Sequence, residues 1–277
     1  METKDQKISE KISNSITIGD GSPLLLIAGP CQIESKDHAL FMAKSIQNAI
    51  EGLPVNLVYK SSYDKANRTS ASGKRGIGIE EGLKILQDVK NEFNVPVITD
   101  VHLPSDVSMV AEVVDILQIP AFLCRQTDLL LAAGSANKTV MIKKGQFLAP
   151  SDMKFAAEKV RINSDSPILL CERGTSFGYR DLVVDFRGLG IMRSLGYPVV
   201  FDATHSVQSL GGNNGSSGGA REWIRPLSRA AVAFGIDGIF LECHQDPDNA
   251  PSDGPSMLRV EELKSVLEEL CKIRRSL

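Results

Sequence analysis

Eight short apolar runs recur along the chain, and each is followed by a stretch with glycine, serine or charge and then, in most cases, by a segment of helical periodicity. The runs lie at residues 24–28, 57–61, 97–101, 116–119, 140–143, 168–172, 199–202 and 238–242. Continuous apolar runs as short as these are typical of strands that are buried on both faces of a parallel sheet.

The segments between the runs predict helices, because their apolar residues return every three or four positions. Ile79, Leu83 and Leu86, for example, share one helical face. Pro104 suits the first turn of a helix, and Asp152 suits an N-cap. Helices are therefore expected at residues 36–51, 79–93, 104–114, 153–162, 187–195, 221–234 and 260–274.

Alternation of strand and helix predicts a parallel α/β fold, and eight strand units fit a closed (β/α)8 TIM barrel of about 250 residues. An open doubly wound sheet is the alternative, but the Gly-rich dinucleotide turn that would follow its first strand is missing. We predict one barrel domain over residues 1–277, with residues 1–20 as an N-terminal extension. In it, residues 1–15 look weakly structured, and residues 16–18 start a small hairpin.

The Gly/Ser-rich stretch 206–219 lies inside one strand–helix unit and therefore is not an interdomain linker. Its composition predicts a mobile loop that closes over a site at the barrel mouth.

Charge, apolar run length and cysteine pattern exclude several classes of partner and cellular compartment. The chain has 31 Lys and Arg against 34 Asp and Glu, a net charge of −3, which argues against a nucleic-acid partner. Apolar runs stay well short of the roughly 20 residues that span a bilayer, and the polar N-terminus lacks a secretory signal. Five scattered cysteines fit reduced thiols better than a disulfide framework. We therefore expect a cytoplasmic protein without a membrane or nucleic-acid partner.

A basic loop follows the second predicted strand. Residues 60–76 carry five cations among several hydroxyl residues: Lys60, Lys65, Arg68, Lys74 and Arg75. Cations, hydroxyls and backbone N–H groups at a strand end together suit an anionic ligand. The alternative is a basic loop that only faces water.

Polar side chains also follow the other strands, and a barrel would gather them at one mouth. Closure would bring Cys31, His205 and Glu242 together, with Asp253 in reach from the loop after the last strand. A thiolate, an imidazole and two carboxylates suit a divalent transition metal. A buried thiol beside separate hydrogen-bonded polar groups is the alternative, and His102 and His244 are expected to be structural.

A second group at the strand ends is cationic: Lys60, Lys65, Arg68, Arg125, Lys143 and Arg173. Buried charge needs a partner, and few acids lie beside these cations in the sequence. A ligand set with several phosphates would satisfy them. The alternative is a set of internal ion pairs with Asp100, Asp128 or Glu172.

Several segments resemble the 3-deoxy-D-manno-octulosonate 8-phosphate synthase family along nearly the whole chain. They include IAGPCQIES, YKSSYDKANRTS, ITDVHLPSD, LQIPAFLCRQTDLL, IKKGQFLAPSDM, CERGTSFGY, FDATHSVQ and GIFLECHQDPDNAPSDGP. The resemblance implies a cytoplasmic (β/α)8 enzyme, usually a homotetramer. It implies condensation of phosphoenolpyruvate with D-arabinose 5-phosphate and water, which releases phosphate and serves lipopolysaccharide synthesis.

The resemblance also implies roles for individual residues. For phosphoenolpyruvate it implies contacts from Lys60, Ser62, Lys65, Gln118, Ala121, Phe122, Lys143, Arg173 and His205. For the pentose phosphate it implies Asn67, Arg68, Thr69, Asp100 and, from a neighbouring subunit, Arg125. It implies Cys31, His205, Glu242 and Asp253 as metal ligands, and Cys31, Lys60, His205 and Asp253 as the catalytic residues.

Two departures separate the subfamilies. The sister seven-carbon synthase, which uses erythrose 4-phosphate, typically has Lys-Pro-Arg where this chain has Ala66-Asn67 between Lys65 and Arg68. The metal-free branch has Asn in place of Cys31, so Cys31 favours the metal-dependent branch, as does Ser252, whereas Pro255 is more typical of the metal-free one. Zinc, iron(II) and manganese all remain open as the ion. A metal-dependent hydrolase and a non-catalytic binding protein on the same barrel are the further alternatives.

Overall fold

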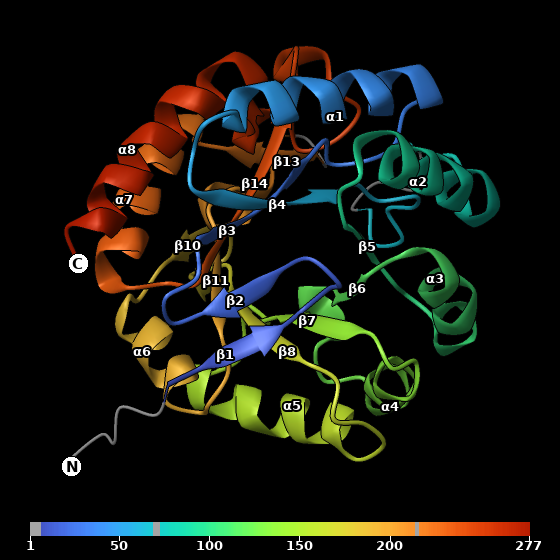
Figure 1. The fold of residues 1–277 in the computed structure, drawn as a ribbon, viewed down its shortest axis with the longest axis vertical. Helices are drawn as coiled ribbons and strands as arrows, with labels where there is room; N and C mark the ends of the chain where they lie inside the picture. Colours follow the sequence, from blue (N-terminus) through green and yellow to red (C-terminus); the bar gives the residue numbers. More distant parts are fainter. Residues whose placement is uncertain (1–6, 69–72, 214–215) are drawn as a thin grey trace.

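Eight parallel strands form a closed ring in the computed structural model, which describes residues 7–68, 73–213 and 216–277 (Figure 1). They are β3 (Leu24–Gly29), β4 (Val55–Lys60), β5 (Val97–Asp100), β6 (Ile116–Ile119), β7 (Thr139–Lys143), β8 (Ile168–Glu172), β11 (Val199–Asp202) and β14 (Gly238–His244). Each strand pairs with the next along the chain, and β14 pairs with both β11 and β3. The predicted barrel is confirmed, and the open sheet is wrong.

Eight helices cover the outside of the ring. They are α1 (Lys36–Ile50), α2 (Ile79–Phe93), α3 (Val107–Val113), α4 (Thr127–Ser135), α5 (Met153–Arg161), α6 (Arg187–Arg193), α7 (Ile224–Phe234) and α8 (Leu263–Arg275). The expected starts of α3, α7 and α8 are short 3-10 turns, at Pro104–Asp106, Arg221–Trp223 and Val260–Glu262. The Asp152 side chain caps no backbone N–H group, because a 3-10 turn over Pro150–Asp152 leads into α5 instead.

Helix α4 was not predicted. Its sequence TDLLLAAGS has no polar stripe, so the helical period is not visible, and the side chain of Gln126 before it accepts no backbone N–H of the first turn. Packing explains why it forms: a Cβ on Gly134 would lie 2.3 Å from the Val160 carbonyl oxygen. The small residue therefore lets α4 approach the backbone of α5 closely, which the local pattern does not reveal.

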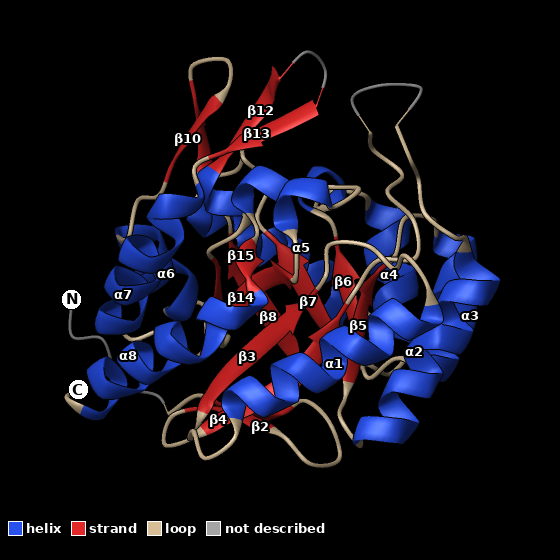
Figure 2. Ribbon diagram, turned by 90° about the horizontal axis from the view of Figure 1, so that it is seen from above, coloured by secondary structure: helices blue, strands red, loops and turns tan. Residues whose placement is uncertain are grey.

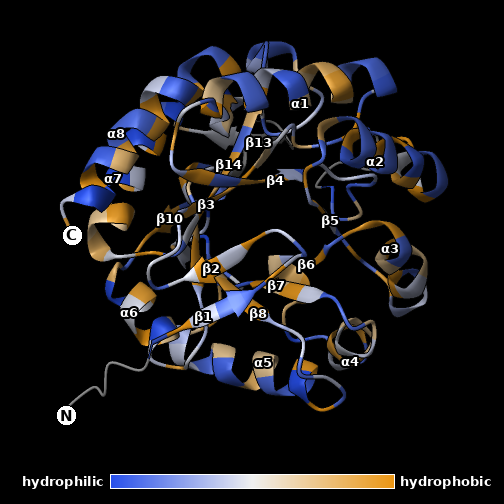
Figure 3. Cartoon of the chain, viewed as in Figure 1, coloured by the Kyte–Doolittle hydropathy of each residue, from blue (hydrophilic) through white to orange (hydrophobic). Residues whose placement is uncertain are grey.

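The barrel strands are apolar on both faces because they separate two cores. In β3, Leu24 and Leu26 pack outward against the helices, whereas Leu25 and Ile27 point into the ring. Side chains alternate in this way because the strand period is two residues. Figure 3 shows the result as orange strands inside a ring of helices whose polar residues face outward.

A short N-terminal hairpin closes the lower end of the barrel. Strands β1 (Ser9–Lys11) and β2 (Thr17–Gly19) pair antiparallel, and Figure 1 shows them across the ring. Ile12, Ile16 and Ile18 join the inner core. The predicted N-terminal hairpin is confirmed, but residues 16–18, which were expected to start it, belong to its second strand. Residues 7–15, which looked weakly structured from the sequence, form its first half. Their apolar residues are too few to show a pattern, and the barrel interior supplies the burial that orders them.

Two further hairpins, not predicted, stand on the opposite end of the barrel (Figure 2). Strand β9 (Thr175–Phe177) pairs with β10 (Asp181–Val183), and β12 (Gln208–Asn213) pairs with β13 (Ser216–Gly219) where a mobile loop was expected. A short strand β15 (Leu258–Arg259) also extends β14. Within the described part of the chain, no helix is both long and apolar enough to cross a bilayer.

Candidate active site

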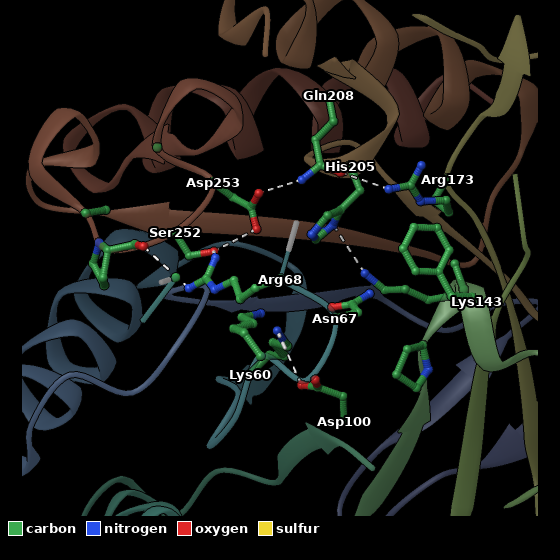
Figure 4. A pocket seen from close by; sticks show the side chains of 18 of the residues that line it. Lys60, Asn67, Arg68, Asp100, Lys143, Arg173, His205, Gln208, Ser252 and Asp253 are labelled. Atoms are coloured by element: carbon green, nitrogen blue, oxygen red, sulfur yellow. Dashed lines mark hydrogen bonds and ion pairs between the residues drawn. The ribbon is translucent and has the colours of Figure 1, made fainter. Parts of the chain in front are cut away.

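A cavity of 510 Å³ opens at the carboxyl ends of the barrel strands (Figure 4). This volume is in the usual range for a small-molecule site. Most of the predicted site residues line it: Lys60, Lys65, Asn67, Arg68, Asp100, Gln118, Ala121, Phe122, Lys143, Arg173, His205 and Asp253. They come from the carboxyl ends of seven different strands and from the loops that follow these strands, so only ring closure could bring them together.

The other predicted residues lie elsewhere. Cys31, Ser62 and Glu242 are buried directly behind the cavity wall and contact residues that line it. Arg125 lines a separate cavity of 310 Å³ against α5 and does not line the main cavity of its own chain. Thr69 lies outside the described residues.

Three of the predicted metal ligands form a tight group. The Cys31 sulfur and carboxylate oxygens of Glu242 and Asp253 all lie within 4.8 Å of one another. The Cys31 Sγ–H donates to Asp253 Oδ2 at 3.0 Å. Glu242 Oε2 is buried, and no described group gives it a hydrogen bond. An orphaned carboxylate oxygen beside a thiol fits a cation, which would satisfy both.

His205 completes this group from one side. Its Nε2 lies 3.8 Å from Glu242 Oε2. Its Nδ1 lies 2.8 Å from Asp202 Oδ2, and the backbone N–H of His205 donates to Asp202 Oδ1 at 2.9 Å. An ionised carboxylate only accepts, so Nδ1 carries a proton, and in the neutral imidazole the lone pair of Nε2 faces Glu242. This is the tautomer that a metal ligand requires, and the four residues therefore fit a divalent ion.

The charges around the group are strongly perturbed. Burial, reinforced by the Glu242 carboxylate, raises the pKa of the Cys31 thiol well above its usual value. Burial works against ionisation of Asp253 too, but His205 and Lys65 outweigh it and lower the pKa of this carboxyl. Asp253 also has a left-handed backbone, with φ of 53°. Such a conformation is uncommon outside glycine and points to a site that the surrounding structure holds in place.

Two of the buried cations are balanced by carboxylates of the protein itself. Lys60 Nζ lies 3.1 Å from Glu242 Oε1 and 3.9 Å from Asp100 Oδ1. Lys143 Nζ lies 2.5 Å from Asp202 Oδ2 and 3.8 Å from the centre of the Phe240 ring. The expectation that the cations lack internal acids is therefore wrong for these two. The partners sit on other strands, where sequence proximity does not show them.

The other two acids considered from sequence do not neutralise the cavity. Glu172 pairs with Lys144 at 3.5 Å and accepts the backbone N–H groups of Arg173 and Gly174. Asp128 lies on the exposed surface of α4.

Lys65 and Arg173 keep unbalanced charge toward the cavity. Among the described residues, neither forms an ion pair with a carboxylate. Lys65 Nζ donates to Ser62 Oγ at 2.9 Å, and Arg173 Nη2 donates to Gln208 Oε1 at 2.9 Å. Arg173 Nη1 is buried, and no group in the described part of the chain accepts from it. A buried, unsatisfied guanidinium that lines a cavity predicts an anionic ligand.

Comparison with known proteins identifies the family. A sequence model of the DAHP synthetase I family matches residues 5–276. The chain belongs to the DAHP synthetase I family. The 2-dehydro-3-deoxyphosphooctonate aldolase of Rickettsia prowazekii is 58% identical over 259 residues, which cover 94% of both chains. The proteins of the same name from Bartonella henselae and Brucella anthropi are 56% and 54% identical, over 94% and 96% of this chain and 93% and 96% of the relatives.

In this member of the DAHP synthetase I family, several residues at the site were not predicted. Asp202 was noted only as a strand end, yet it pairs with both Lys143 and His205. Gln146 and Gln208 line the cavity as buried amides, and Ser252 lies beside Asp253. Gln146 and Gln208 are neutral, so the sequence could mark these two residues only by their nearness to the end of a strand.

A second cluster of possible metal ligands lies outside the cavity. Atoms of Glu34, His38 and His244 lie within 4.8 Å of one another. However, His244 Nδ1 accepts the Asp246 backbone N–H at 3.0 Å, and His244 Nε2 lies 2.7 Å from Glu34 Oε1. Nε2 therefore carries the proton and has no free lone pair. This arrangement is a hydrogen-bonded structural pair, as the sequence suggested for His244.

Proposed function

We propose that this chain condenses phosphoenolpyruvate with D-arabinose 5-phosphate and water to give 3-deoxy-D-manno-octulosonate 8-phosphate and phosphate. It would thus act as a transferase, 3-deoxy-8-phosphooctulonate synthase, for lipopolysaccharide synthesis. The observation that carries the proposal is the pair Lys65 and Arg173, which present unbalanced positive charge to one cavity. The relatives' name, 2-dehydro-3-deoxyphosphooctonate aldolase, supports an eight-carbon sugar phosphate.

In this proposal, phosphoenolpyruvate binds to the cations deepest in the cavity. Lys60, Lys65, Lys143 and Arg173 surround its phosphate and carboxylate, with Ser62, Gln118, Ala121 and His205 around them. Gln118 Oε1 is buried and, within the described residues, unpaired, so it is available as an acceptor. The pentose phosphate occupies the outer part, near Asn67, Arg68 and Asp100, with Thr69 and a neighbouring subunit's Arg125 completing it.

The bond changes then follow from how the substrates are held. C3 of phosphoenolpyruvate forms a bond to the aldehyde carbon of the pentose, and the aldehyde oxygen gains a proton. A water oxygen adds to C2 and loses a proton, and the C2–O bond to phosphate breaks as phosphate leaves. The cations mainly position the substrates and neutralise developing charge. Asp253 and the substrate phosphate are the groups within the site that can move the water proton.

We also propose that Cys31, His205, Glu242 and Asp253 hold a divalent ion: zinc, iron(II) or manganese. The orphaned Glu242 oxygen and the His205 tautomer support this assignment. Such an ion supplies a Lewis acid that can polarise a substrate oxygen. The protein's own part is to orient His205 through Asp202 and to hold the Cys31 thiol against Asp253 until an ion displaces its proton.

One assay tests the activity. Purified protein is incubated with both phosphorylated substrates, and phosphate release and the ketose product are measured. Release that requires both substrates supports the condensation, whereas release from one substrate alone would indicate a metal-dependent hydrolase. No reaction under any metal loading would favour a binding protein.

The sister seven-carbon reaction is tested by the sugar. The comparisons do not favour it, because the relatives described above carry the octonate name. The test replaces arabinose 5-phosphate with erythrose 4-phosphate and compares kcat/KM. We expect a strong preference for the pentose, and equal use of both sugars would argue for the sister activity.

We further propose a homo-oligomer, a tetramer, that works in the cytoplasm. The position of Arg125 supports assembly, because this residue does not line the main cavity of its own chain and would be available to a sugar phosphate bound in another subunit. Exposed Phe122, Phe147 and Phe155 offer apolar area for such contacts. Sedimentation of the purified protein tests the assembly state, and a monomer would remove this role of Arg125.

A further inference from the structure

Asp253 is connected to two arginines of the cavity, in each case through one neutral side chain (Figure 4). On one side, Gln208 Nε2 donates to Asp253 Oδ1 at 2.7 Å, and Gln208 Oε1 accepts from Arg173 Nη2 at 2.9 Å. On the other side, Ser252 Oγ donates to Asp253 Oδ2 at 3.1 Å and accepts from Arg68 Nη1 at 2.7 Å. The two arms meet on the two oxygens of one carboxylate.

The chemistry of the two ends fixes the orientation of each connecting group. A guanidinium only donates and an ionised carboxylate only accepts, so the Gln208 oxygen must face Arg173 and its amide nitrogen must face Asp253. A serine hydroxyl between the same two groups must likewise accept from one and donate to the other. A neutral side chain that offers both roles is therefore required at both positions.

Both connecting side chains are held in place. Gln208 is 7% exposed and Ser252 is 5% exposed. Gln208 is the first residue of β12, and Ser252 lies in the loop after β14, so the arms come from different elements. Burial limits the alternative rotamers of both side chains. A shift of either guanidinium therefore changes the hydrogen bond that the connecting side chain makes to Asp253.

Both arginines also have N–H groups that can donate to an anionic ligand. Arg173 Nη1 is buried and has no acceptor within the described residues. Arg68 lines the same cavity and uses its Nη2 for Gln32 Oε1 at 2.7 Å, which leaves a second hydrogen on Nη1. An anion bound at either position would fix the guanidinium and, through it, the neutral side chain and Asp253.

We propose that Gln208 and Ser252 are positioning residues that couple anion binding at Arg173 and at Arg68, respectively, to divalent-metal binding at Asp253. The inference rests on the proposed metal and substrate sites. Order imposed on Asp253 by one ligand lowers the ordering cost for the next, so each anion tightens the metal, and by linkage the metal tightens each anion. Partners of a ligating carboxylate typically change metal affinity about 10–100-fold when they are removed.

A crossed pair of variants tests this coupling. Zinc affinity of the wild-type protein is measured by competition with a chromophoric chelator, without ligand, with phosphoenolpyruvate alone and with arabinose 5-phosphate alone. One substrate alone cannot turn over, so these are equilibrium measurements. The same series is run on Gln208→Met, which keeps side-chain length, and on Ser252→Ala. Gln47→Met is the matched control, because Gln47 is a partly buried amide on α1 that donates to the Phe93 carbonyl and does not line the cavity.

In the wild type, we expect each substrate to tighten zinc by roughly 5–150-fold, the usual range of coupling between sites. Gln208→Met is expected to lose most of the phosphoenolpyruvate effect and keep the sugar-phosphate effect, and Ser252→Ala is expected to do the reverse. Gln47→Met is expected to keep both effects. Direct electrostatic attraction between the anion and the metal would be the same in all variants, so only the crossed pattern supports coupling through Gln208 and Ser252.

Three results would overturn the inference. They are an absence of coupling in the wild type, coupling that neither substitution changes, and equal loss of both effects in both variants. If zinc does not bind, or binds without Cys31, the proposed metal site is overturned together with the coupling. A failure of the metal site is thus distinguished from a failure of the coupling alone. If Gln208→Met does not fold, Gln208→Glu replaces it: the carboxylate can still accept from Arg173 but repels Asp253, and the expected pattern is the same.

Discussion

His205 donates from Nδ1 to Asp202 Oδ2 over 2.8 Å, and this bond decides which ring nitrogen faces the cavity. Asp202 is fully buried, and burial opposes its ionisation, but His205 and Lys143 outweigh burial and lower the pKa of this carboxyl. The carboxylate is thus held as an acceptor for Nδ1–H, so that the neutral form of His205 presents its Nε2 lone pair to Glu242. Metal-ligating histidines are usually oriented by such a partner.

The substitution Asp202→Asn should therefore weaken metal binding roughly 10–100-fold. The amide removes the charge that holds the tautomer and balances Lys143, while the side chain keeps its size. Metal affinity by chelator competition is the measurement. Asp88→Asn, which breaks only the exposed pair with Lys36, serves as the control and should leave the affinity unchanged. An unchanged affinity for Asp202→Asn would show that the hydrogen bond does not orient a ligand.

Removal of the metal should abolish activity, and zinc, iron(II) or manganese should restore it. Cys31→Asn should lose stoichiometric metal, because an amide cannot furnish a thiolate. The assay follows product formation before and after a strong chelator, together with the metal content of both proteins. Wild-type activity that survives complete metal removal would contradict the role given to Cys31, and the variant then shows whether asparagine supports a metal-free reaction.

Arg173→Met should raise the KM for phosphoenolpyruvate by roughly one to two orders of magnitude, because a hydrogen bond to a charged group contributes about 1.5–3 kcal/mol. The buried Nη1 of Arg173 has no acceptor in the described part of the chain, so a substrate anion is its natural partner. Steady-state kinetics in phosphoenolpyruvate measure this. Lys84→Met on the exposed face of α2 should have no effect. A normal KM for Arg173→Met would place the anion elsewhere.

Ionisation of Asp100 should make the free energy of unfolding depend on pH in the acid range. Burial alone would raise the pKa of this carboxyl, but Lys60, the hydrogen bond to His102 and Lys65 hold it well below its usual value. A lowered pKa stabilises the fold above the unfolded value of about 4, and this contribution is lost as the pH falls toward the folded value.

Asp100→Asn should accordingly destabilise the protein by about 1.5–3 kcal/mol at neutral pH, because Ser62 and His102 lose a charged acceptor while Glu242 still balances Lys60. The difference in unfolding free energy between wild type and variant should shrink below about pH 4. Urea titrations across this range measure it. A difference that stays constant with pH would mean that the carboxylate is not ionised in the fold.

Ile18→Ala should destabilise the barrel by about 2–5 kcal/mol, the usual cost of such a cavity. Ile18 is 0% exposed and packs with the inward side chains of the ring. Ile162→Ala is the matched control, because Ile162 is 67% exposed and its truncation should change stability by less than about 0.5 kcal/mol. Equal urea midpoints for the two variants would show that the hairpin does not seal the barrel.

The amino-acid sequence by itself determined the barrel and the side of it that carries the chemistry. Each strand was visible as a local apolar run, and parallel strands in a closed ring must place all their carboxyl ends at one mouth. Lys60, Lys143, Arg173 and His205 were therefore predictable as neighbours, although they are far apart in the chain. Helix α4 and the first strand of the N-terminal hairpin were not, because their order comes from packing against α5 and the barrel interior.

Only the tertiary structure decided which group is paired with which. Lys143 and Asp202 are 59 positions apart, and Gln208 and Asp253 are 45 positions apart, yet each pair is in hydrogen-bond contact. Sequence separation says nothing about such contacts, because they depend on strand order, side-chain direction and the reach of loops. For the same reason, the sequence did not show which acids balance Lys60 and Lys143. It marked Ser252 only as a subfamily feature, and it did not show that Gln208 and Ser252 join Asp253 to Arg173 and Arg68.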